Sequence, residues 1–109
     1  MASNVFMLSY TVSRKEVHSY YDHKAKSAAD HVRDKIPKVN QYWETHGDVD
    51  TTLTGTMDLS GYLDKISAAR SMISEKIKPL FKEVPSEFKP EVSCVLVVNG
   101  INDLIKFKL

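Results

Sequence analysis

The residues with the clearest capacity for chemistry stand together in one short segment. His46, Asp48 and Asp50 alternate with Gly47 and Val49. An imidazole with two carboxylates can bind a metal ion or transfer protons in acid and base catalysis. Asp and Gly are also the residues that turns favour, because they adopt unusual backbone conformations easily. We therefore interpret the segment as a turn first and a metal-dependent site second, and we assign no catalytic residue, metal or cofactor to the chain.

The single cysteine and a pair of helical residues have simpler explanations than catalysis. Cys94 lies in the apolar run 92–98, where nothing nearby in sequence lowers the pKa of its thiol, so we expect a core cysteine. His18 and Asp22 are four residues apart and can touch on a helix, but we favour a solvated helix face as their explanation.

Several features of the sequence favour a cytoplasmic protein. One cysteine cannot form an internal disulfide, which suits a reducing compartment. The first residues do not resemble a signal peptide, and no apolar run approaches the ~20 residues that a membrane-spanning helix needs. We expect no membrane partner.

The charge of the chain is balanced, with 15 basic and 14 acidic residues and a net charge of +1. Binding to nucleic acid would therefore need a local patch. Two groups of basic residues, around Arg33 and Lys35 and around Lys76 and Lys78, are interleaved with acidic residues, as is typical of solvated helix faces.

Aromatic residues are a second means by which a protein binds nucleic acid. Tyr20, Tyr21, Tyr42 and Trp43 would be stacking surfaces if they lay on an open sheet face. Tyr21 falls on an apolar helical stripe and is expected in the core, whereas Trp43 fits either position.

The first half of the chain predicts a strand, a helix and a hairpin. Residues 5–12 are β-branched and aromatic, which predicts a buried central strand. Ser13 and Glu16 have capping-box spacing, so a helix is expected from there until Pro37. Segments 39–45 and 51–57 predict an antiparallel hairpin, with Gly55 as the mark of a bulge.

The second half predicts a helix and a final hairpin. Ser60 is the expected cap of a helix that Pro79 ends or kinks. Residues 85–90 read as a loop whose Phe88 packs on the core. Segment 92–98 is strongly β-prone, and Asn99-Gly100 predicts a tight turn into a last strand over 101–109.

This order of elements predicts a single α+β domain over residues 1–109, a ferredoxin-like split βαβ sandwich. The pattern is βαββαβ plus a C-terminal hairpin strand, with two helices on one face of an antiparallel sheet. The other face and the last strand are free to bind a partner. We therefore expect a homodimer, and leave open whether the last strand pairs within its own chain or across the dimer.

On these residues the chain resembles the small ferredoxin-fold CRISPR-associated endoribonuclease-like family. The resemblance lies in the opening strand 5–10, the helix after it, Trp43, the segment Asp50-Thr51-Thr52 and the final strand pair. Nuclease members carry an aspartate directly after the tyrosine of the first strand, where it holds a metal at the dimer axis. Thr11 occupies that position here, and a hydroxyl cannot replace a carboxylate as a hard-cation ligand. The resemblance thus implies that this chain has lost the metal-dependent chemistry.

Two functions follow as expectations. The first is a non-catalytic interaction module, a homodimer that binds another protein as an inhibitor or regulatory factor of bacterial or phage type. The second is a nucleic-acid-binding or nuclease-like protein of the resembled family. The candidate interaction residues are Trp43, Tyr42, Arg33, Lys35, Ile105, Lys106, Phe107 and Lys108.

Overall fold

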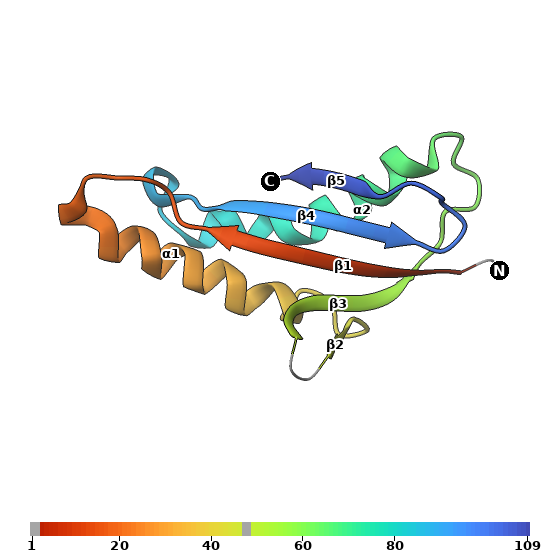
Figure 1. Cartoon of the computed structure of the whole chain (residues 1–109), viewed down its shortest axis with the longest axis horizontal. Helices are drawn as coiled ribbons and strands as arrows, with labels where there is room; N and C mark the ends of the chain where they lie inside the picture. The colour runs from red at the N-terminus through yellow and green to blue at the C-terminus, as the bar shows by residue number, and fades with distance from the viewer. Residues whose placement is uncertain (1–2, 47–48) are drawn as a thin grey trace.

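The chain forms one five-stranded antiparallel sheet with two α-helices, which confirms the predicted α+β class. The computed structural model describes residues 3–46 and 49–109. Its main elements are β1 (Asn4–Ser13), α1 (Asp22–Lys35), β2 (Glu44–His46), β3 (Val49–Met57), α2 (Lys65–Ile77), β4 (Glu91–Val98) and β5 (Ile105–Lys108). The sheet order is β2-β3-β1-β4-β5 (Figure 1).

Strand β1 is the centre of the sheet. It pairs with β3 from Asn4↔Met57 to Ser9↔Thr52, and with β4 as far as Ser13↔Glu91. The central strand was predicted correctly, but it is buried on one face only. Side chains alternate between the two faces of a strand, so the buried Phe6, Leu8 and Tyr10 share one face and the exposed residues between them lie on the other.

The core is formed by the buried face of the sheet and the apolar sides of both helices. Val32 and Ile36 at the end of α1 belong to the same buried cluster as Ile73 and Ile77 of α2 and Leu8 of β1. Cys94 is 2% exposed in this cluster and Phe88 is 8% exposed beside α1, so both predicted core positions are confirmed.

The first helix begins later than predicted. Strand β1 continues through Ser13 because its pairing with β4 extends to that residue, and α1 starts only at Asp22. The Ser13–Glu16 capping box was therefore wrong, since long-range strand pairing overrides the local capping signal. Tyr21 precedes the helix and is 43% exposed, so its predicted core position was also wrong.

The second helix also has a different cap. It begins at Lys65 behind Asp64, whose Oδ1 accepts a hydrogen bond from the Ser67 backbone N–H at 3.0 Å. Ser60 instead donates through its backbone N–H and its hydroxyl to Asp58. Asp is as good an N-cap as Ser. The helix is capped by Asp64, which lies nearer in sequence to its buried residues than Ser60 does.

Both hairpins depart from the predicted form. Strand β2 contains only Glu44–His46, and the bulge lies between Thr45 and His46 and not at Gly55. The last turn closes with a bond from Ile101 N–H to the Val98 carbonyl at 3.0 Å, and Gly100 has φ of +94°. Strand β5 starts only at Ile105, so the connection is longer than a two-residue turn.

Gly55 has a packing role that explains its place in a strand. A Cβ at this position would lie 2.8 Å from both Phe6 Cε1 and Trp43 Cδ1. The two rings meet edge to face, with centroids 5.6 Å apart and an interplanar angle of 80°. The missing side chain of the glycine lets the aromatic pair sit directly on the sheet.

We predict that Gly55→Ala lowers the free energy of unfolding by about 1 to 3 kcal/mol, because the added methyl must displace a packed ring. Urea denaturation measures the change. The control is Thr56→Val at the exposed neighbouring position, which keeps a β-branched side chain and should change stability by less than about 0.5 kcal/mol. Equal stability of the Gly55→Ala variant and the unchanged chain would contradict this packing role.

Candidate functional site

In the part of the chain that the structure describes, the histidines and the carboxylate singled out for chemistry are dispersed and already bonded. His46 Nε2 lies 2.7 Å from Thr54 Oγ1 across β2 and β3. Asp22 pairs with Arg14 at 3.1 Å, and His18 Nδ1 accepts a hydrogen bond from the Tyr20 backbone N–H. Asp48 and the side chain of Asp50 lie outside the described residues. Across the ranges 3–46 and 49–109, no group of three His, Cys, Asp or Glu is arranged to hold a metal ion.

Cys94 does not have the surroundings of a nucleophile. Its side chain lies on the buried face of β4, and this burial raises the pKa of the thiol to about 12. A reactive cysteine needs a nearby cation or helix N-terminus to stabilise the thiolate. The geometry therefore agrees with a core residue.

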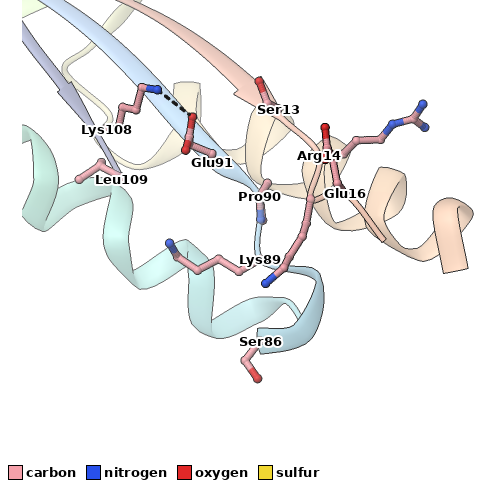
Figure 2. A pocket seen from close by; sticks show the side chains of 10 residues that line it. Ser13, Arg14, Glu16, Ser86, Lys89, Pro90, Glu91, Lys108 and Leu109 are labelled. Atoms are coloured by element: carbon pink, nitrogen blue, oxygen red, sulfur yellow. Dashed lines mark ion pairs between the residues drawn. The ribbon is translucent and has the colours of Figure 1, made fainter. Parts of the chain in front are cut away.

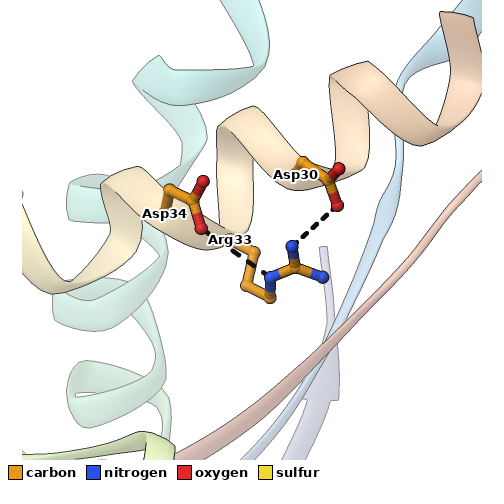
Figure 3. A network of polar contacts seen from close by, with 3 residues as sticks. All are labelled: Asp30, Arg33 and Asp34. Atoms are coloured by element: carbon orange, nitrogen blue, oxygen red, sulfur yellow. Dashed lines mark hydrogen bonds and ion pairs between the residues drawn. The ribbon is translucent and has the colours of Figure 1, made fainter.

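Arg33 is held by two neighbouring carboxylates (Figure 3). Its Nη2 lies 2.7 Å from Asp30 Oδ1, and its Nε lies 3.8 Å from Asp34 Oδ1. Exposed ion pairs of this kind add little stability, but they offset the positive charge locally. Lys35, two residues along α1, is exposed but points to a different side of the helix.

The two aromatic candidates beside β2 separate in the structure. Trp43 is half-buried and packs on the core through Phe6, whereas Tyr42 is 78% exposed. Trp43 therefore helps to hold the connection before β2 on the sheet, and Tyr42 is the ring that solvent can reach.

The four candidates on β5 divide between the two faces of the sheet. Ile105 is 2% exposed and Phe107 is half-buried, and both pack on the core. Lys106 and Lys108 are exposed on the opposite face. Lys108 pairs with Glu91 of β4 at 3.4 Å.

An apolar surface that the sequence prediction missed covers the middle of this exposed face. It consists of Val5 and Met7 on β1 and Val95 and Val97 on β4, which are 55%, 45%, 36% and 38% exposed. Met7 and Val97 are direct cross-strand partners. We call these four residues the open-face patch. The sequence contains a signal for this patch. In 5–8 and in 95–98 every residue is apolar, so the residues that point to either face of the strand are apolar.

A cleft of about 560 Å³ lies at one end of the sheet, beside the end of β1, the start of β4 and the end of β5. Figure 2 shows its lining, which includes Arg14, Lys89, Glu91 and Lys108. Lys15 and Glu16 complete the charged groups, so four cations face two carboxylates. The ammonium of Lys89 also stands 4.4 Å from the centroid of the Phe81 ring. We call this the basic cleft.

No protein-family model, curated protein or solved structure matches this chain. Among the helices of residues 3–46 and 49–109, none is both long and apolar enough to cross a bilayer.

We predict that Cys94 resists thiol reagents while the protein is folded. At pH 8 a thiol with a pKa of about 12 is only about 0.01% ionised, and burial also blocks access. Labelling with a disulfide reagent should proceed only as fast as the protein unfolds, and should become rapid in denaturant. Fast labelling of the native protein would show that the thiol is accessible.

Proposed function

We propose that the chain is a non-catalytic protein-interaction module that forms a homodimer and binds another protein as an inhibitor or regulatory factor. The observation that carries the proposal is the open-face patch, a group of aliphatic side chains exposed at the centre of a sheet. The largest contiguous apolar patch on the surface of a soluble protein is often a binding site.

The sheet order supports a ferredoxin-like sandwich. The first strand lies between the third and the fourth, as right-handed crossovers of a split βαβ unit require. Both helices contribute to the cluster that covers Phe6, Leu8 and Tyr10. In this arrangement they cover one face of the sheet and leave the open-face patch uncovered.

The size of the exposed face suits a second copy of the same chain. With strands about 4.8 Å apart and a rise of about 3.3 Å per residue, the face measures about 20 Å across and about 30 Å along β1, its longest strand. A stable interface buries about 800 Å² of accessible surface on each partner, so a dimer would have to use nearly the whole face. Two such faces would form a sandwich with a shared apolar layer.

Charge favours one orientation of the two sheets. Glu44 on β2 and Lys106 on β5 lie at opposite edges of the sheet. Their pairing with Thr54 and Val95 places both side chains on the exposed face. A two-fold axis that lies between the two faces and runs parallel to the strands places β5 of one protomer over β2 of its partner. Lys106 of each protomer then lies near Glu44 of the other. An axis perpendicular to the strands would set lysines against lysines, which is unfavourable.

A second candidate function is nucleic-acid binding of the kind that the resembled family implies. It is favoured by Lys106 and Lys108, which project from the same face and lead into the basic cleft. It predicts binding of single-stranded RNA or DNA that weakens as salt rises and disappears in a Lys106→Glu, Lys108→Glu variant. Flat titrations at low salt would exclude it.

We predict a dimer that a charge in the open-face patch dissociates. Met7→Glu and Val97→Glu should each raise the dimer Kd at least tenfold, because each would bury an unpaired carboxylate in the apolar layer. Sedimentation equilibrium measures the Kd, and circular dichroism checks that the variants fold.

The matched control is Leu63→Glu. Leu63 is as apolar as the patch residues and is fully exposed in the segment before α2. This variant should remain a dimer. A monomeric unchanged chain, or patch variants that dimerise as well as the control, would overturn the homodimer.

A further inference from the structure

Strand β5 presents a free backbone edge. Val92 and Leu109 exchange two backbone hydrogen bonds, of 3.0 and 2.8 Å. Bonded pairs recur at every second residue of an antiparallel ladder, so Phe107 and Ile105 also bond to β4. The N–H and C=O groups of Lys106 and Lys108 then point away from the sheet. Within the described part of the chain β5 is the last strand, and no strand pairs with these groups.

The side chains of this edge specify the partner. Lys106 and Lys108 are exposed on one face, while Phe107 and Leu109 are half-buried on the other. A strand added beside β5 would place its alternate residues next to the lysines and its remaining residues next to the apolar pair. Opposite charges on directly paired residues are favourable, and like charges are unfavourable.

A second copy of the chain does not fit this edge. An antiparallel pair of two β5 strands centred on Phe107 sets Lys106 of each protomer opposite Lys108 of its partner. A pair centred on either lysine sets that residue opposite itself. Lysines on an edge strand commonly prevent such self-pairing.

The basic cleft extends the positive charge beyond the end of β5. Lys108 contributes to both surfaces, and the cleft adds Lys15 and Lys89. Arg14 is paired with Asp22, and Glu91 is paired with Lys108. Lys15 and Lys89 have no carboxylate partner among the described residues, so they can receive the carboxylates at one end of an added strand.

We propose that the outer edge of β5 and the basic cleft bind an extended acidic segment of another protein by β-strand addition. The segment has Asp or Glu at alternate positions, next to Lys106 and Lys108, and apolar residues between them, next to Phe107 and Leu109. The inference rests on the proposed protein-binding function but does not require the dimer. A protein strand is favoured over nucleic acid because only a peptide can pair with the free backbone groups.

The test uses a fluorescein-labelled peptide of alternating glutamate and valine, about eight residues long, titrated with the intact protein by fluorescence anisotropy. Saturable binding is expected, and a Lys106→Glu, Lys108→Glu variant should bind at least tenfold more weakly. The same variant should gain affinity for a peptide of alternating lysine and valine. The control variant Lys24→Glu, Lys26→Glu makes an equal change of charge at exposed positions on α1 and should leave binding unchanged.

A second peptide separates strand pairing from simple charge attraction. N-methylation of the residues whose N–H groups face β5 removes backbone donors but keeps every charge, so this peptide should lose binding. Equal binding of the methylated peptide, equal weakening by the α1 variant, or displacement of the acidic peptide by single-stranded RNA would overturn the proposal.

Failure of this proposal can be distinguished from failure of the dimer. The Met7→Glu variant should bind the acidic peptide as the unchanged chain does, because the patch and the β5 edge are separate surfaces. A dimer that binds no acidic peptide would overturn the edge site alone. A monomer that binds the peptide would overturn the homodimer alone.

Discussion

The double pairing of β1 is the constraint on which the rest of the structure depends. Its register with β3 and β4 fixes Phe6, Leu8 and Tyr10 on the core face. A slip of one residue would exchange the two faces of the strand and place Ser9 in the core. The correct register also brings Phe6 opposite Gly55, where Trp43 closes over its ring. The central strand therefore sets the hydrophobic core and the position of the segment before β2.

The same register creates the exposed apolar surface. Both alternating sets of residues at the start of β1 are apolar, and only one of them is buried. Val5 and Met7, with Val95 and Val97, therefore add little to the stability of the isolated chain, because much of their surface stays in water. Threonine would be the expected occupant of such positions if the face only met solvent, and β3 carries Thr52, Thr54 and Thr56 on this face. This difference between the strands is a reason to propose contact at the centre of the face.

The sequence was most predictive where the signal lay within one element. Strand β4 and the buried Cys94 needed only a continuous, β-prone apolar run. The start of α1 was missed because Ser13 belongs to a strand ladder that only the partner Glu91 reveals. Gly55 was misread because its role depends on two rings from other parts of the chain. The open-face patch was missed because a doubly apolar strand predicts burial on both sides.

The two surfaces make opposite use of charge. The open-face patch is uncharged and is wide enough to meet an identical face, whereas the edge of β5 carries Lys106 and Lys108 and repels a copy of itself. An unprotected edge beside an apolar face would let copies add to one another without limit, since each new protomer would expose another edge. Lysines on β5 remove that route while leaving the edge open to an acidic strand. A closed dimer would use the face of the sheet and a heterologous partner the backbone edge of β5, and Lys106 is the side chain that lies beside both.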